Sequence, residues 1–269
     1  MTYQQILYKV EDRIATITLN RPERLNAWTD VMSQEVYDAM HAAAQDKTVR
    51  VIVLTGAGRA YCVGADIEGL AESDPKALAT KLPRPFDMNR RADYQTRHTW
   101  HPAIGKPIIA MLNGATAGLG LVNALGCDVR FAAEDAVFTT AFARIGLSAE
   151  YGIAWMLARV VGHANALDLL LSGRKLGASE AQRLGLVNFV HPRDQLAKAT
   201  YAYARELAEW CSPRSMRAIK QQVWEAPFLT LAEAVAMANR DMAIGSALPD
   251  FKEGLSAFLE KRRPGFADE

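Results

Sequence analysis

The sequence predicts an α/β body that extends to about residue 195 and is followed by a tail made of helices alone. Three observations support this prediction. Short β-branched runs, such as residues 49–54, alternate in the body with segments of helical periodicity, as in a sheet covered by helices. Beyond residue 194 only helical periodicity remains. Within the body, the glycine-rich stretch 113–120 joins a predicted strand to a predicted helix.

Composition restricts the possible classes of protein. At 269 residues and 50% hydrophobic, the chain can bury a large core. A net charge of +1 gives no broad attraction to nucleic acid or to a membrane surface. Cys62, Cys127 and Cys211 lie far apart, as expected of free thiols in a reducing compartment. The N-terminus lacks the apolar run of a signal peptide, and no apolar segment is long enough for a membrane span, so we expect a soluble cytoplasmic protein.

The N-terminal half contains strand and helix patterns in turn. Two β-rich runs, 6–9 and 14–20, flank an acidic turn and predict a hairpin. Apolar residues at three-to-five spacing predict an amphipathic helix over 29–44, which the buried strand 49–54 follows. Residues 59–70 are expected to form an irregular loop that leads into a short helix.

The next segment, 71–101, differs in kind. It contains three prolines, many charges and no clean period, which predicts a mobile lid with helical pieces. A strand over 107–112 then leads into the glycine-rich turn 113–120. Further strands are expected at 129–131, 136–138 and 187–190, and further helices at 154–161, 164–171, 179–184, 195–209, 212–225, 230–243 and 249–261. Ser179 is the expected N-cap of its helix.

The glycine-rich turn is a candidate site for an anionic oxygen, because the first N–H groups of a helix have no intrahelical acceptor. A short-chain dehydrogenase is disfavoured, since the turn comes more than a hundred residues into the chain and no tyrosine has a lysine four residues later. Ser148 lacks the second glycine of a nucleophile elbow, which disfavours a serine hydrolase. No spacing of His, Cys or acidic residues indicates a metal site.

Several motifs occur together in a fixed order. They are Asn20-Arg-Pro-Glu-Arg-Leu-Asn-Ala27, Val51-Ile-Val-Leu-Thr-Gly56, Ala60-Tyr-Cys-Val-Gly-Ala-Asp-Ile67, Lys106-Pro-Ile-Ile-Ala110 with Asn113-Gly114, and Cys127-Asp128. In combination they resemble the crotonase (enoyl-CoA hydratase/isomerase) superfamily, and the resemblance continues into the tail at 250–262. It implies a crotonase-like spiral of ββα turns over 1–195 and a helical trimerisation tail over 196–269. It also implies an acyl-CoA substrate, no cofactor other than this coenzyme A, and a homotrimer or a hexamer.

The resemblance assigns the oxygen to the thioester carbonyl of an acyl-CoA. Two backbone N–H groups, those of Val63 and Leu119, then hold this oxygen while the substrate becomes an enolate. Preorganised donors of this kind stabilise developing negative charge, and each is worth about 3–4 kcal/mol of barrier. For either loop alone, a tight connection without function is the simpler interpretation.

The remaining site residues are also implied by the resemblance. Those expected to bind coenzyme A or substrate are Arg24, Leu25, Ala27, Gly64, Ala65, Asp66, Ile67, Gly118, Phe142, Phe258 and Lys261, the last two reaching the CoA of a neighbouring subunit in many relatives.

The chain departs from the usual pattern at the acid/base positions. Typical hydratases have two catalytic glutamates, and here those positions are Val122 and Phe142, which cannot transfer protons. One acid is nearby: Glu150 occupies a position where dienoyl-CoA isomerases and 4-chlorobenzoyl-CoA dehalogenases use an aspartate. In an apolar pocket beside Phe142 and Trp155 its pKa should rise, which suits a general base. The alternative is a solvent-facing or salt-bridged glutamate on a loop.

The lid offers further candidates for a partner group. They are Arg90, Arg91, Tyr94, His98 and His101, each of which, taken singly, is interpreted first as a surface polar residue. The sequence therefore predicts an acyl-CoA lyase or isomerase that uses Val63, Leu119 and Glu150 for double-bond isomerisation or an atypical hydration. The alternative is a catalytically silent acyl-CoA-binding homologue.

Overall fold

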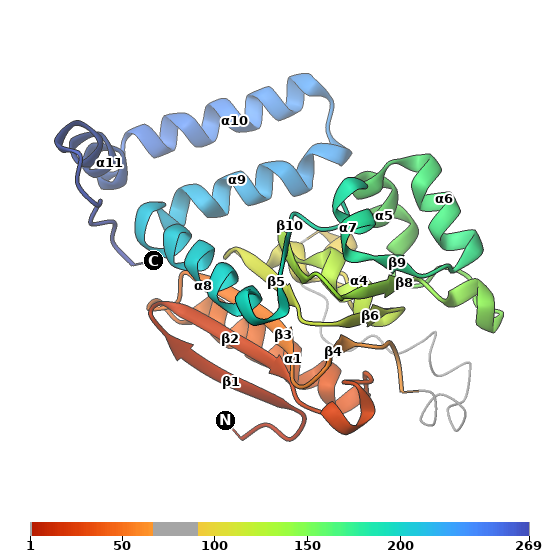
Figure 1. Ribbon diagram of the computed structural model, residues 1–269. Coiled ribbons are helices and arrows are strands. Elements are labelled where there is room, and N and C mark those ends of the chain that lie inside the picture. Colours follow the sequence, from red (N-terminus) through yellow and green to blue (C-terminus); the bar gives the residue numbers. More distant parts are fainter. Residues whose placement is uncertain (1, 67–90, 269) are drawn as a thin grey trace.

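A six-stranded sheet forms the centre of the body in the computed structural model, which describes residues 2–66 and 91–268 (Figure 1). Its order is β1-β2-β3-β5-β7-β10, and its strands are β1 (Ile6–Glu11), β2 (Ile14–Leu19), β3 (Val51–Gly56), β5 (Ile108–Leu112), β7 (Val129–Ala133) and β10 (Phe189–His191). The expected hairpin is confirmed, with β1 antiparallel to β2, and the other pairs are parallel. Every residue of β3 and β5 is buried, as their continuous apolar runs predict.

A second, smaller sheet contains the short strands β4 (Ala60–Cys62), β6 (Ala115–Ala117), β8 (Val137–Thr139) and β9 (Leu176–Gly177) in that order. Two expectations are corrected here. The irregular loop over 59–70 contains β4, and the glycine-rich turn 113–120 contains β6. Strands of three residues are too short to show a period of two, so only their pairing partners identify them.

The two sheets alternate along the chain. Each of β3, β5 and β7 in the first sheet is followed directly by β4, β6 or β8 in the second, and a helix follows the β5–β6 pair. This arrangement confirms the predicted spiral of ββα turns. The helices of the body are α1 (Asp30–Gln45), α4 (Leu119–Gly126), α5 (Ile153–Val161), α6 (His163–Ser172), α7 (Ala178–Arg183) and α8 (Arg193–Trp210). Most of α8 falls in the predicted tail 196–269, but it packs on the first sheet, so we count it with the body.

Local signals set most helix ends. Thr29 caps α1 by accepting a hydrogen bond from the Met32 N–H, and Gly162 ends α5. The expected cap at Ser179 is wrong, because α7 begins directly after β9 with Gly177 as its N-cap. Short 3₁₀ turns complete the body: η1 (Pro22–Arg24), η2 (Ala92–Tyr94), η3 (His101–Ala103) and η4 (Phe142–Ile145). Over the described ranges, no helix combines the length and apolar character that a membrane crossing requires.

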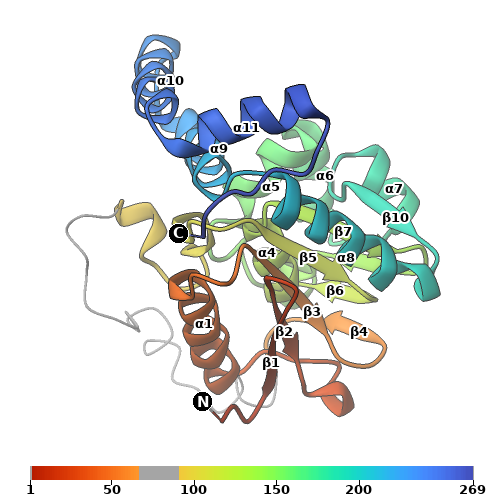
Figure 2. The same ribbon diagram turned by 90° about the vertical axis from the view of Figure 1, so that its left-hand side faces the viewer.

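The tail projects from the body as α9 (Pro213–Glu225), the turn η5 (Ala226–Phe228), α10 (Leu231–Ser246) and α11 (Pro249–Glu260) (Figures 1 and 2). Ser212 caps α9, and Thr230 forms a capping box with Glu233 at the start of α10. Many apolar side chains of these helices remain exposed.

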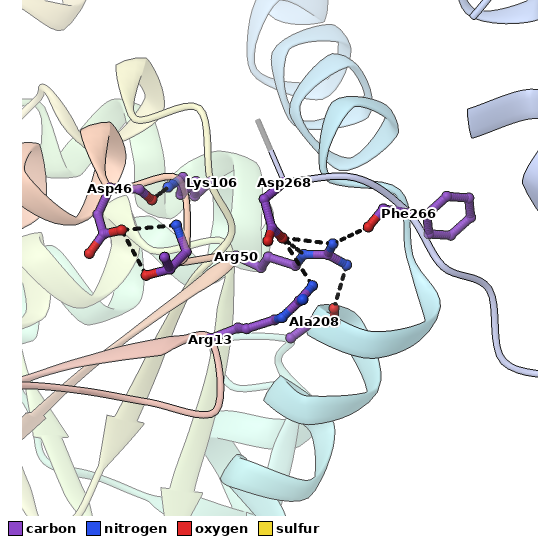
Figure 3. A network of polar contacts seen from close by, with 8 residues as sticks. Arg13, Asp46, Arg50, Lys106, Ala208, Phe266 and Asp268 are labelled. Carbon is purple, nitrogen blue, oxygen red and sulfur yellow. Dashed lines mark hydrogen bonds and ion pairs between the residues drawn. The ribbon is translucent and has the colours of Figure 1, made fainter. Parts of the chain in front are cut away.

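After α11 the chain returns to the body, where Arg50 holds it (Figure 3). The Arg50 side chain is 3% exposed and donates to the Asp268 carboxylate and to the Phe266 and Ala208 carbonyl oxygens. Arg13 donates to the same carboxylate at 3.0 Å. A buried guanidinium is stable only when its donors are satisfied. Arg13 and Arg50 therefore hold residues 266–268 against the body, and these residues in turn supply acceptors for the buried Arg50 guanidinium.

Candidate active site

The two predicted donor loops begin at the ends of neighbouring strands. β4 and β6 are parallel, and Cys62 at the end of β4 pairs with Thr116. The carboxyl ends of parallel strands meet at one edge of a sheet, where α/β proteins bind ligands. The loops are in contact there, since a Cβ added to Gly118 would lie 3.8 Å from the Gly64 Cα. The structure therefore brings the Val63 and Leu119 loops together.

The two candidate donors differ in their present hydrogen bonding. Leu119 is the first residue of α4, so its N–H belongs to the first turn, which has no intrahelical acceptor. The turn before it requires glycine, because Gly118 has φ 47°. The Val63 N–H donates to the Leu25 carbonyl oxygen at 3.3 Å, a long hydrogen bond. Any ligand oxygen bound by Val63 competes with this weak contact.

Gly120 allows α4 to start so close to β4. A Cβ at this position would lie 2.3 Å from the Cys62 carbonyl oxygen, a distance that real Cβ atoms do not show. The helix N-terminus can therefore reach the strand edge only with glycine at residue 120.

The segment predicted to bind coenzyme A is paired with the first donor loop. The Trp28 N–H donates to the Gly64 carbonyl oxygen at 2.8 Å, and the Asp66 N–H donates to that of Trp28 at 2.9 Å. Trp28 and Ala65 form a parallel bridge. Ala65 and Asp66 therefore lie beside residues 24–28, as the resemblance implies. Ile67 lies outside the described residues.

The Arg21 side chain connects the 24–28 segment to the loop that contains Asp66. Its guanidinium donates to the Ala27 carbonyl oxygen at 2.7 Å and to Asp66 at 2.9 Å. Leu25 is half-buried with φ 50°, and Arg24 is exposed at the surface. The exposed Arg24 guanidinium thus lies next to a backbone segment that Arg21 holds in place, an arrangement that suits a phosphate-bearing ligand.

Two asparagines support the site, although the sequence analysis gave them no role. Asn26 is fully buried and donates to the Ala57 and Ala60 carbonyl oxygens, each at 2.9 Å. Asn113 accepts from the Gly56 N–H at 3.2 Å and also donates to Ala60. Both asparagines belong to the sequence motifs that resemble the crotonase superfamily. Side-chain amides in these positions supply hydrogen bonds to loop backbone groups that would otherwise be unpaired.

The acid/base positions show a clear contrast. Val122 is fully buried in α4, and Phe142 is buried at the start of η4. Glu150 is half-buried between η4 and α5, and burial raises the pKa of its carboxyl group. Among the residues that the structure describes, Glu150 forms no ion pair, which counts against a salt-bridged role.

An apolar pocket of about 340 Å³ opens beside Tyr151, the residue after Glu150, but neither Glu150 nor Phe142 is among its lining residues. It lies between the 93–102 segment, the start of α5 and the tail, and Tyr94, Thr99, Tyr151, Trp155 and Phe228 are among its lining residues. The Trp155 and Phe228 rings stack with centroids 5.4 Å apart, so this pocket has a rigid aromatic wall. A hydrocarbon or aromatic acyl group is the kind of ligand that such a wall accommodates.

The interpretation of the lid candidates as surface residues is wrong for three of them. Tyr94, His98 and His101 are buried, because their rings pack into the body and the tail. Arg91 is partly buried and pairs with Asp93 and Glu225. Arg90 lies outside the described residues. A polar residue that becomes buried cannot be told from an exposed one by the local sequence, because its burial depends on residues that are distant in the chain.

Both buried histidines are neutral. Burial, together with the charge of Arg97, lowers the pKa of His98 to about 3. Burial likewise lowers the pKa of His101 to about 3, with a contribution from Lys220. Neither ring can serve as a proton donor near neutral pH.

The two predicted tail residues lie apart from the other site residues of their own chain. Phe258 is 81% exposed on α11, and Lys261 caps that helix in a left-handed conformation. Both views place α11 far from β4 and its loop (Figures 1 and 2). In this chain, therefore, neither residue reaches the segment around Ala27.

Known proteins match the chain over nearly its full length. The family model described as enoyl-CoA hydratase/isomerase matches residues 9–269. A 1,2-epoxyphenylacetyl-CoA isomerase of Escherichia coli is 36% identical over 97% of both chains. A probable enoyl-CoA hydratase of Rhodobacter capsulatus is 38% identical over 99% of both.

Solved structures give the same result for the fold. An enoyl-CoA hydratase from Bacillus anthracis superposes with a TM-score of 0.90 at 27% identity, covering 99% of this chain and 100% of that one. A probable enoyl-CoA hydratase/isomerase from Mycobacterium abscessus gives 0.86 at 30% identity, covering 98% and 99%. The predicted crotonase fold is confirmed.

Proposed function

The chain belongs to the enoyl-CoA hydratase/isomerase family, and from this premise we propose that it converts an acyl-CoA through an oxyanion-stabilised enolate, by double-bond isomerisation or an atypical hydration. One observation carries the proposal. The loops of Val63 and Leu119 meet at one strand edge, hydrocarbon side chains occupy both usual glutamate positions, and Glu150 is a half-buried carboxylate on the loop between η4 and α5.

In this proposal the Val63 and Leu119 N–H groups bind the thioester oxygen. Glu150, as a carboxylate, takes a proton from the α-carbon, and the electron pair moves onto that oxygen. For isomerisation the protonated Glu150 returns the proton to the γ-carbon, so the double bond moves and no proton is lost. The pKa of Glu150, raised by burial, brings the carboxyl group closer to neutrality and makes it a stronger base.

Standard hydration is disfavoured by the same residues. It needs two groups that position a water molecule and exchange its protons. Val122 and Phe142 have no polar atom in their side chains, and both are buried. A single carboxylate can shuttle one proton between two carbons, which favours isomerisation.

We further propose that a second copy of the chain completes the coenzyme A site. Phe258 and Lys261 are exposed and distant from Ala27 in their own chain, while the tail exposes a large apolar surface. A homotrimer or hexamer brings the tail of one subunit to the exposed Arg24 of another. Coenzyme A, as part of the substrate, is the only cofactor that this chemistry requires.

Exchange of α-protons tests the function directly. The protein is incubated with a saturated acyl-CoA in D₂O, and loss of the α-proton signal is followed by NMR, with affinity for the same ligand measured separately. Glu150→Gln should slow exchange by about 10²–10⁴-fold. Leu119→Pro should slow it by about 10²–10³-fold, since proline lacks the N–H but fits the first helical position. Leu119→Ala, which retains the N–H, measures the effect of losing the side chain alone.

Two outcomes would contradict the proposal. If the wild type binds acyl-CoA without exchanging its α-protons and converts no enoyl thioester, the chain is a silent acyl-CoA-binding protein. If Glu150→Gln exchanges as fast as the wild type, another group is the base.

A further inference from the structure

A cluster of buried polar atoms lies beside the proposed active site, on Trp28, His98 and Asn123. Among the residues described, Trp28 Nε1, both His98 ring nitrogens and Asn123 Oδ1 have no hydrogen-bond partner. The exposed fractions of these residues are only 3%, 1% and 0%. Buried polar groups are nearly always paired, so a cluster of this kind is expected where a protein binds a polar group from outside the polypeptide.

The three side chains come from three parts of the site. Trp28 bridges the first donor loop at Ala65, and Asn123 follows Val122 on α4. The His98 ring contacts the Trp28 ring edge-on, with centroids 5.5 Å apart, and Asn123 faces it. On its other side His98 contacts the ring of Tyr151, the residue after Glu150, at 4.8 Å. The cluster therefore lies where the CoA-binding segment, the oxyanion helix and the Glu150 loop converge.

The backbone holds His98 in an unusual conformation at this point. Its φ is +67°, in the left-handed region that bulky side chains rarely adopt. Such conformations persist where the surrounding structure fixes them, and they are frequent at ligand sites. Thr96 and Thr99, which flank His98, line the apolar pocket beside Tyr151. The cluster thus adjoins the pocket proposed for the acyl group.

The hydrogen-bonding capacity of the cluster defines its ligand. Trp28 can only donate and Asn123 Oδ1 can only accept, while a neutral imidazole offers one donor and one acceptor. The Asn123 amide nitrogen already donates to the Leu119 carbonyl oxygen at 2.9 Å, which fixes the direction of Oδ1. Because the Asn123 side chain faces His98, we assign the His98 N–H to Asn123 Oδ1, which leaves the Trp28 N–H and the other His98 nitrogen for a ligand. A hydroxyl accepts the first and donates to the second, whereas a carbonyl cannot donate and an ammonium cannot accept.

We propose that Trp28, His98 and Asn123 form a subsite for a hydroxyl oxygen, supplied either by a hydroxylated acyl group or by a bound water molecule that the substrate contacts. The inference rests on the proposed function. Where the acyl group supplies the hydroxyl, it narrows the substrate class to acyl-CoA thioesters that carry a hydroxyl on the acyl chain.

The acyl source is tested with inert ligands, so that catalysis is not needed. A series of alkyl-CoA thioethers, with a hydroxyl moved along the chain, is titrated by calorimetry against the deoxy counterpart of each. One hydroxylated ligand should bind the wild type about 10-fold or more tightly than its counterpart. Trp28→Phe and Asn123→Leu should each abolish that preference.

Tyr61→Phe is the matched control. Its hydroxyl is also buried without a partner among the described residues, and the groups that raise its pKa besides burial are Cys127 and Cys62, not His98. This variant should keep the preference for the hydroxylated ligand.

The water source is tested by a high-resolution crystal structure of the wild type and of Trp28→Phe. An ordered water bound to Trp28 Nε1 and His98 in the wild type, and lost in Trp28→Phe, supports the subsite even without a ligand preference. A preference that survives both Trp28→Phe and Asn123→Leu overturns the proposal. So does the absence of both a preference and a bound water. If no CoA thioether binds at all, the proposed function fails, and the crystal structures still decide the subsite.

Discussion

The helices α4 and α10 show how differently the two regions of this molecule use apolar sequence. All eight residues of α4 are buried, whereas α10, with sixteen residues, has no buried residue. Leu231 and Met242 of α10 are 81% and 66% exposed. The body thus buries its apolar residues within one chain, and the tail presents them outward.

This difference has a consequence for the site. In the body, backbone meets backbone, as at Gly120 against β4 and Gly118 against Gly64, so the donor loops have little freedom. The helices α9–α11 expose many large apolar side chains, and exposed apolar surface of this kind commonly marks a contact with another protein when the side chains are contiguous. In the function proposed above, the body therefore holds the thioester oxygen by itself, and the tail is the part proposed to contact a neighbouring subunit.

Replacing one glycine by alanine in each region should give the largest difference in the free energy of unfolding between body and tail. Gly120→Ala places Cβ 2.3 Å from the Cys62 carbonyl oxygen, and we expect it to lower the free energy of unfolding by more than about 3 kcal/mol. Gly254→Ala, in α11, meets only the Phe266 ring at 3.5 Å and should raise stability by about 0.5–1 kcal/mol. Urea unfolding of both variants checks this, and equal losses would remove the distinction between the regions.

Acid should weaken the body before the tail. Burial lowers the pKa of His101 from 6.5 to about 3, so its neutral form stabilises the fold fully above pH 6.5 and loses this effect as the pH falls toward 3. Hydrogen bonds from Arg262 lower the pKa of Glu253 from 4.5 to about 2, so that contribution is complete above pH 4.5 and is lost toward pH 2.

Two variants separate the pH range in which His101 acts from the range in which Glu253 acts. Between pH 6.5 and 4.5, His101→Leu should flatten the decline in unfolding free energy, whereas Glu253→Gln should leave the slope unchanged. Urea unfolding at a series of pH values measures both slopes. A slope in this range that follows Glu253 would contradict the assignment.

A substitution on the surface of the tail should have the smallest effect on the stability of the single chain. Leu255 is 52% exposed on α11, so Leu255→Gln should change the stability of the monomer by no more than about 0.5 kcal/mol. It should nevertheless weaken self-association, measured by sedimentation velocity over a range of concentrations. Lys252→Gln on the same helix is the control and should leave association unchanged. Equal association in both variants would show that this face of α11 lies outside the contact.

Much of the architecture was predictable because its signals are local. The helix over 29–44 has its cap at Thr29 and its apolar period within one short segment, and both survive in α1. The motif order predicted the family, which the comparisons confirm, and also the two donor loops, whose role stays a prediction. The cap at Ser179 failed for a local reason as well, because the chain enters α7 directly from a two-residue strand.

The sequence by itself determined the order of the longer helices and strands, the family, and the absence of glutamates at positions 122 and 142; its prediction of Glu150 as the base stays a proposal. Only the tertiary structure decided that β4 and β6 exist, that His98 is buried, and that Trp28, His98 and Asn123, each with an unpartnered polar atom among the described residues, meet beside the donor loops. The physical reason is the range of the interactions. Capping and periodicity act within a few residues, but a three-residue strand or a buried histidine is defined by partners far away in the chain.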